Sequence, residues 1–258
     1  HGTENDFLLI FDPDGARNIS SKETAALCNR STGVGADGLI RIVKRDGTWF
    51  MDYRNADGSI AEMCGNGIRV MARYLVDRDH QGAGIFSIAT RDGKKYLSCP
   101  EQGDISVNMG QVSLVDGEIT ASSNGRVWNG LNINVGNPHA VVFVDSISDV
   151  GDLKHPPVVR PKDVYPEGVN VEFVEFTGEN EISMRVYERG VGETRSCGTG
   201  TCAVALAATI KKGRKLPATW IINPPGGRLS VEIDPHSNAT LKGPAVLIRD
   251  IELGAFLG

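Results

Sequence analysis

One arrangement of residues occurs twice in this chain, and it restricts the fold more than any other feature. The stretch "NADGSIAEMCGNGIRVMARYLV" surrounds Cys64, and "ERGVGETRSCGTGTCA", residues 188–203, surrounds Cys197, 133 positions later. Nearly the same shift aligns three further pairs, which are Gly35 with Gly168, Asn55 with Glu188, and Asn5 with Asn137. Self-similarity at a fixed offset indicates repeated structural units. We therefore predict two equivalent domains, residues 1–115 and 116–243.

Short apolar segments dominate each half and predict strands over residues 7–11, 39–43, 48–54, 140–145, 169–176, 181–188 and 228–234. Two convincing helices interrupt them, one after each cysteine. In the first, apolar residues recur at helical spacing, and Arg69 and Arg73 are expected to be solvated on the other face. The second, "AVALAATI" (203–210), is apolar on every side, which indicates an enclosed helix. The predicted fold class is α/β (α+β), with two pseudo-symmetric domains, each a curled, mostly antiparallel sheet around a central helix.

Composition argues against several classes of protein. With 258 residues, 40% of them hydrophobic, and a formal charge of -5, the chain has the balance of a globular protein and lacks the basic surface that nucleic-acid binding needs. Its longest apolar stretch, residues 202–210, is far short of the roughly 18 residues of a membrane span. Five cysteines are few and odd in number, so we expect reduced thiols in a cytoplasmic protein.

Both repeated cysteines stand at the predicted start of a helix. The first backbone N–H groups of a helix have no partner within the helix, and that end attracts anions. Glycines at 65, 67, 198 and 200 leave room for a ligand beside those groups, and a substrate carboxylate fits this cradle. The same position lowers the pKa of a thiol, so we expect a thiolate near neutral pH.

Two such cysteines on opposite sides of one substrate could invert a carbon next to a carboxylate. One sulfur would remove the proton from one face, and the other would return a proton to the opposite face. The helix N-termini would stabilise the charge that develops on the carboxylate. This chemistry requires no cofactor and no metal, and the sequence contains neither a zinc-type CxxC pair nor a His/carboxylate cluster.

The segments "NADGSIAEMCGNG", "GNPH", "GVNV" and "ERGVGETRSCGTGTCA", in this order, closely resemble the diaminopimelate epimerase family, over residues 5 to about 227. The resemblance implies two similar α/β domains with the active site between them. It implies cofactor-independent interconversion of LL- and meso-2,6-diaminopimelate, in lysine and peptidoglycan precursor synthesis, by a cytoplasmic homodimer. It also implies that the last segment, residues 244–258 with "AVLIRDIEL", returns to the first domain as a strand.

The resemblance assigns roles position by position. Cys64 and Cys197 match the acid/base pair, and His139 and Glu188 match polar partners that set the protonation of the thiols. Substrate-holding positions are matched by Asn5, Asn55, Asn137, Asn170 and Arg189, the last facing the distal carboxylate. Backbone groups that grip the carboxylate at the reacting carbon are matched by Gly65, Asn66, Gly198 and Thr199. The chain departs from many relatives at Gly38, where they carry a glutamine that lines the site.

Two other functions are compatible with the residues. A related cofactor-free racemase, for proline or hydroxyproline, would share the paired cysteines. A thiol redox or metal-binding protein could also use Cys64 and Cys197, although neither lies in a CxxC. If the two thiols face each other, oxidation is expected to join them as a disulfide when substrate is absent. Cys28, Cys99 and Cys202 are expected to be inert core residues.

Overall fold

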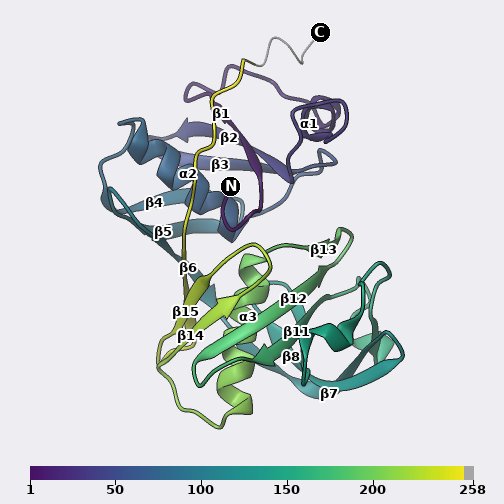
Figure 1. The fold of residues 1–258 in the computed structure, drawn as a ribbon. Helices are drawn as coiled ribbons and strands as arrows, with labels where there is room; N and C mark the ends of the chain where they lie inside the picture. Colours follow the sequence, from purple (N-terminus) through teal and green to yellow (C-terminus); the bar gives the residue numbers. More distant parts are fainter. Residues whose placement is uncertain (253–258) are drawn as a thin grey trace. The chain divides into compact units, whose positions relative to one another are not determined.

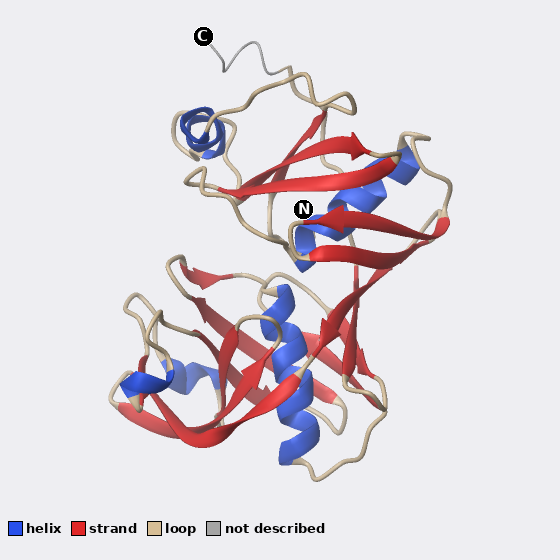
Figure 2. Ribbon diagram, turned by 180° about the vertical axis from the view of Figure 1, so that it is seen from behind, coloured by secondary structure: helices blue, strands red, loops and turns tan. Residues whose placement is uncertain are grey.

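The computed structural model describes residues 1–252 and divides into two compact units (Figure 1). The first comprises His1–Val107 and the segment from Gly243, and the second comprises Asn108–Lys242. The division falls inside strand β6 (Ile105–Gln111), whereas the sequence placed the join at residue 115. Each unit is built mainly of strands with one long helix packed against them, which confirms the predicted fold class (Figure 2).

The first unit contains five strands before β6, a short helix and a long one. They are β1 (Phe7–Phe11), α1 (Ser21–Cys28), β2 (Gly38–Arg45), β3 (Thr48–Asn55), α2 (Gly65–Asp77), β4 (Gly84–Thr90) and β5 (Gly93–Cys99). The strands lie in the order β1-β2-β3-β4-β5-β6. β1 is parallel to β2 and β3 to β4, and the other neighbours are antiparallel. Helix α2 packs against β1, β2 and β5.

The second unit contains the remaining strands, two short 3-10 turns and the helix α3. They are β7 (Ser113–Ser123), β8 (Arg126–Asn134), β9 (Pro138–Phe143), β10 (Val158–Arg160), β11 (Asn170–Phe176), β12 (Glu181–Glu188), β13 (Gly192–Thr194), α3 (Gly198–Lys211), β14 (Ala218–Asn223), β15 (Leu229–Ile233) and β16 (Asn238–Gly243). The 3-10 turns are η1 (Ile147–Val150) and η2 (Lys162–Val164). The strand order is β16-β15-β14-β12-β11-β9-β8-β7-β10, with β13 beside β12.

The predicted repeat is visible in the strand pairing. Strands β9, β11, β12, β14, β15 and β16 follow the same order as β1 to β6, with the same sequence of parallel and antiparallel neighbours. The long helix follows the third strand in each series, and α3 begins 133 residues after α2. The cysteine that precedes each helix therefore occupies the same topological position in its own unit.

Helix α3 is buried as predicted, whereas α2 is more buried than predicted. Nearly all of α3 is buried, as its apolar sequence indicates. In α2, however, the expectation that Arg69 and Arg73 are solvated is wrong, because their exposed fractions are 0% and 6%. Arg73 donates to the backbone carbonyls of Pro100, Glu101 and Gly103, so its charge is satisfied by chain that covers this face of the helix. No helix within residues 1–252 is long and apolar enough to cross a membrane.

The predicted strand at the C-terminus is wrong for the part that the structure describes. Residues 244–252 of this segment belong to the first unit but form no regular strand, and Leu253 lies outside the described residues. Val246 exchanges two hydrogen bonds with His1, at 2.8 and 2.9 Å. The pairing stops there because the chain turns away directly afterwards, at Thr3 and Glu4, both with positive φ.

Candidate active site

Cys64 is the N-cap residue of α2. Its backbone is extended, with φ -138° and ψ 118°, and its Sγ accepts the backbone N–H of Gly67 at 3.5 Å. Gly65 and Asn66 are the first two residues of the helix, so their N–H groups lie in its first turn. A side chain at Gly67 would come within 2.9 Å of Ile40 and 3.0 Å of Met51, which explains why the third helical position is glycine. The predicted helix-start arrangement is thus present in the first unit.

Asn5 lies beside this helix start. Its Oδ1 is 3.8 Å from the Sγ of Cys64 and accepts the Nδ2 of Asn66 at 3.2 Å. Its Nδ2 donates to Asp37 Oδ2 at 2.9 Å, so both ends of the amide are held. Asn5 also closes a tight turn with Gly2, through two backbone hydrogen bonds of 3.1 and 3.2 Å. Asp37, which the sequence did not single out, is therefore the residue that fixes Asn5 beside the thiol.

Asn55 and Gly38 face each other across the last pair of the β2–β3 ladder. The Nδ2 of Asn55 donates to the hydroxyl of Ser59 at 3.0 Å. A Cβ at position 38 would lie 2.6 Å from the Tyr53 ring and 2.7 Å from the carbonyl oxygen of Arg54. The space that a longer side chain at position 38 would enter is therefore already filled by Tyr53.

Cys197 repeats the geometry of Cys64 in the second unit. It is the N-cap residue of α3, with φ -129° and ψ 119°, and its Sγ accepts the N–H of Gly200 at 3.4 Å. Gly198 and Thr199 begin the helix, and the hydroxyl of Thr199 lies 3.6 Å from the Sγ. The exposed fraction of Cys197 is 7%.

The protonation of Cys197 differs from the expectation. Burial raises the pKa of this thiol well above its ordinary value, and the nearby carboxylates of Glu188 and Glu172 raise it further. The hydrogen bonds from Thr199 and the Gly200 N–H lower it, but by less. The helix start alone would favour the thiolate. The predicted lowering of the thiol pKa is wrong here because desolvation and two negative charges outweigh the helix N-terminus.

Glu188 lies at the end of β12, next to Cys197. Burial raises the pKa of its carboxyl group, and Glu172 raises it too, whereas hydrogen bonds from Thr194 and Cys197 lower it. The hydroxyl of Thr194, in the neighbouring strand β13, donates to Oε1. Glu188 is thus a second proton-binding group in contact with the thiol.

His139 is completely buried, as is its partner Glu172, each with an exposed fraction of 0%. The Nδ1 of His139 lies 2.7 Å from Oε1 of Glu172, and its Nε2 lies 3.0 Å from Oδ1 of Asn137. Asn137 in turn lies within 3.5 Å of the Thr199 hydroxyl through its Nδ2. A chain of polar contacts therefore connects Glu172 to the residues around Cys197. The sequence did not single out Glu172, which looks like one more residue of a strand.

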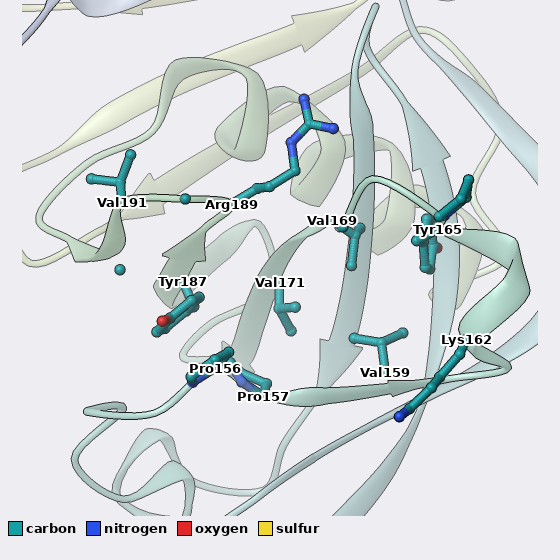
Figure 3. A pocket seen from close by; sticks show the side chains of 14 residues that line it. Pro156, Pro157, Val159, Lys162, Tyr165, Val169, Val171, Tyr187, Arg189 and Val191 are labelled. Atoms are coloured by element: carbon teal, nitrogen blue, oxygen red, sulfur yellow. The ribbon is translucent and has the colours of Figure 1, made fainter. Parts of the chain in front are cut away.

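Asn170 begins strand β11, and Arg189 directly follows the end of the neighbouring strand β12. Asn170 is buried, and its Oδ1 accepts the backbone N–H of Arg189 at 2.9 Å. The Arg189 side chain is 42% exposed and lies 3.8 Å from the carboxylate of Glu167. It is at the edge of a pocket of about 720 Å³ in the second unit, with its guanidinium directed away from the prolines and valines of the pocket (Figure 3). Asn170 thus holds the backbone that carries Arg189.

The predicted site residues therefore form two groups. One, around Cys64, contains Asn5, Gly65 and Asn66. Asn55 lies in the same unit at the end of β3, where its side chain contacts Ser59. The other, around Cys197, contains Asn137, His139, Glu188, Gly198 and Thr199, with Asn170 and Arg189 on the adjoining strand ends. Among residues 1–252, no group of three or more His, Cys, Asp and Glu side chains is placed to hold a metal ion.

Comparison with solved structures supports the fold. A phenazine biosynthesis protein of the PhzF family from Bacillus anthracis superposes with a TM-score of 0.73 at 15% identity, covering 93% of this chain and 90% of that one. A hydroxyproline epimerase from Agrobacterium vitis gives a TM-score of 0.67 at 14% identity, covering 93% of this chain and 86% of that one. At these identities the likeness concerns the fold alone.

Sequence comparison is more specific. A family model described as "Diaminopimelate epimerase" matches residues 1–115 and 131–248. The diaminopimelate epimerase of Streptomyces coelicolor is 45% identical, over 98% of this chain and 93% of its own. That of Thermobifida fusca is 42% identical, over 99% of this chain and 97% of its own. With the model and both relatives matching nearly throughout, the chain belongs to the diaminopimelate epimerase family.

Proposed function

We propose that this chain interconverts LL- and meso-2,6-diaminopimelate by two-base proton transfer between Cys64 and Cys197. The observation that carries the proposal is the duplicated N-cap geometry. In each unit a cysteine precedes the helix that follows the third strand, and its Sγ accepts the N–H three residues on. A reaction that treats the two faces of one carbon alike needs two such groups. We infer the substrate, diaminopimelate, from the family to which the chain belongs.

The raised pKa of the Cys197 thiol suggests its part in the proposed reaction. Because Cys197 holds its proton strongly, it acts as the acid when Cys64 acts as the base. The Cα–H bond of the substrate breaks, its proton passes to the Cys64 thiolate, and the carbanion takes the proton of the Cys197 thiol on the opposite face. Cys64 is then a thiol and Cys197 a thiolate, and the reverse reaction uses them in the opposite roles.

Backbone groups at the two helix starts are proposed to bind the carboxylate at the reacting carbon. They are the N–H groups of Gly65 and Asn66 in α2 and of Gly198 and Thr199 in α3. The amides of Asn5, Asn55, Asn137 and Asn170 hold the rest of the substrate, and Glu188 and His139 tune the Cys197 half. Arg189, with an exposed planar fork, suits the distal carboxylate. The scheme uses no cofactor, and we place the enzyme in the cytoplasm as a homodimer in lysine and peptidoglycan precursor synthesis.

Separate Cys64→Ala and Cys197→Ala variants test the mechanism. Loss of a general acid or base typically costs about 10²- to 10⁴-fold in rate, and we expect losses of this size in both variants. Cys99→Ala is the control, because Cys99 is buried like Cys197 but lies at the end of β5 and at neither helix start. A folded Cys64 or Cys197 variant that epimerises at the wild-type rate would contradict the proposal.

A cofactor-free proline or hydroxyproline racemase is the second candidate, favoured only by the shared fold. Incubation in heavy water separates the two. The wild-type enzyme is expected to introduce deuterium at the α-carbon of LL-diaminopimelate and not at that of proline or hydroxyproline. The thiol redox or metal-binding alternative predicts no exchange with any of the three, and it predicts that a chelator or a thiol reductant changes activity.

A further inference from the structure

We propose that Glu172 is a positioning residue, which acts through His139 to orient the substrate-facing amide of Asn137. The inference deepens the proposed function and rests on it for its kinetic part. Glu172 lies in β11, the strand that stands beside β9, which carries His139. Neither its identity nor its position follows from the duplicated cysteine motif.

The burial of Glu172 requires a reason. A carboxylate removed from water costs several kcal/mol unless a charged or hydrogen-bonding partner compensates. Its Oε1 has such a partner in His139, at 2.7 Å, with both side chains fully buried. The other oxygen, Oε2, is buried and accepts no hydrogen bond from the described protein residues. The carboxylate therefore makes one strong directed contact, and that contact is to a ring whose other nitrogen points at the site.

Each ring nitrogen of His139 is in contact with one oxygen atom. Its Nδ1 faces the carboxylate of Glu172, and its Nε2 faces the Oδ1 of Asn137 at 3.0 Å. An oxygen atom lies at each end of the ring, so the proposed arrangement has Nε2–H donating to Asn137 while Nδ1 forms the hydrogen bond with Glu172. The Nε2–H donates to Asn137, which forces the carbonyl oxygen of that amide inward.

The outward end of the Asn137 amide is then its NH₂ group. It lies 3.5 Å from the Thr199 hydroxyl, which is itself 3.6 Å from the Sγ of Cys197. An NH₂ donor at this place attracts a carboxylate, whereas a carbonyl oxygen would repel it. If His139 lost its Nε2 proton, the amide would turn over and present the wrong end. Glu172 opposes this because its hydrogen bond at Nδ1 holds the ring with Nε2 toward Asn137.

Gly200 makes room for this arrangement. A Cβ at position 200 would lie 2.7 Å from Oε1 of Glu172 and 3.4 Å from the Sγ of Cys197. The third residue of α3 is therefore glycine where the carboxylate comes closest to the helix start. The Glu172 carboxylate therefore lies against the first turn of α3, close to Cys197.

The test combines spectroscopy with a double-mutant cycle. In wild-type protein labelled with ¹⁵N-histidine, we expect the His139 Nε2 to carry a proton and the Nδ1 proton to be shifted strongly downfield. The resonances are assigned by their loss in His139→Asn. An unprotonated Nε2 in the wild-type protein would overturn the proposal without any kinetic measurement and whether or not a variant folds.

The kinetic part uses Glu172→Gln, which keeps the shape but replaces the carboxyl group with an amide. We expect kcat/KM for diaminopimelate to fall at least tenfold and the downfield Nδ1 signal to disappear. Glu175→Gln is the control, because Glu175 lies on the same strand and accepts a structural hydrogen bond from Ile147 at 2.7 Å, and we expect less than a twofold change. In an Asn137→Ala background, the effect of Glu172→Gln should shrink below twofold.

Besides an unprotonated Nε2 in the wild-type protein, three outcomes contradict the inference. They are a folded Glu172→Gln protein with wild-type kcat/KM, a Glu172→Gln protein with unchanged His139 signals, and a loss of activity that is fully additive with Asn137→Ala. Wild-type activity with diaminopimelate is measured first, so a failure of the proposed function is recognised separately.

Discussion

Gly38→Ala is a small change whose effect on stability can be worked out from the contacts around position 38. The added Cβ would lie 2.6 Å from Cε2 of Tyr53 and 2.7 Å from the carbonyl oxygen of Arg54. The ring could rotate or shift, but the carbonyl belongs to the backbone of the neighbouring strand. Gly38 does not adopt a positive φ, so the backbone itself would accept alanine. The cost of the substitution therefore comes from packing alone.

The magnitude follows from two opposing effects. Overpacking of a well-packed region costs about 1–3 kcal/mol. Alanine also restricts the unfolded chain, which returns about 0.4–1 kcal/mol. We expect a net destabilisation of about 1–2 kcal/mol, and since 1 kcal/mol shifts Tm by about 2–4 °C in a protein of this size, Tm should fall by about 2–8 °C.

The assay is thermal and urea unfolding of the wild type, Gly38→Ala, two control variants, and Gly38→Ala in one of the control backgrounds. Gly82→Ala is the first control, because nothing lies within 4 Å of its Cβ and its φ is not positive, so it should be neutral or slightly stabilising. The second is Tyr53→Leu, which removes the ring. In that background Gly38→Ala should cost less, although the contact with Arg54 remains. A Gly38→Ala protein as stable as wild type, or an equal cost in both backgrounds, would refute the packing argument.

The remaining predictions concern the thiols and the core. Glu188→Gln should lower the pKa of Cys197, since a neighbouring negative charge is removed, so iodoacetamide should alkylate Cys197 faster at a given pH; an unchanged rate would contradict the assignment. In the wild type, kcat/KM should fall as the pH falls through the raised pKa of Glu188, and the Glu188→Gln variant should lack this fall. Thr209→Val leaves the buried indole N–H of Trp220 without its acceptor at 2.9 Å and should cost about 1–3 kcal/mol in urea unfolding, whereas Thr209→Ser should not. Oxidation of substrate-free protein should link Cys64 to Cys197 and stop turnover until a reductant is added, and non-reducing peptide maps without this link would exclude it.

The duplication made the fold predictable. Equivalent strands and helices keep their spacing, so an offset found from cysteines, glycines and asparagines also relates β3 to β12 and α2 to α3. Strands with clear apolar patterns, such as β11 and β12, lie within a residue of their predicted bounds. Helix α1 was missed although it has a sequence signal, because Ser20 and Glu23 form a capping box at its start.

Other features depend on contacts between distant segments and leave no local pattern. Arg73 is buried because the loop after β5 offers it three carbonyl oxygens, and helical periodicity carries no trace of that loop. Glu172 occupies a strand whose alternation does not distinguish an exposed carboxylate from a fully buried one. The pKa of Cys197 follows from carboxylates on β11 and β12, whereas the sequence showed only the helix start.

The two helix starts share a backbone geometry, and the carboxylates beside Cys197 bear on its part in the proposed proton transfer. Beside Cys64 lie the neutral amides of Asn5 and Asn66. Beside Cys197 lie Glu188 and, through Gly200, the buried Glu172. In the proposed reaction, the carboxylates beside Cys197 keep its thiol protonated, so Cys197 donates a proton when Cys64 takes one from the substrate.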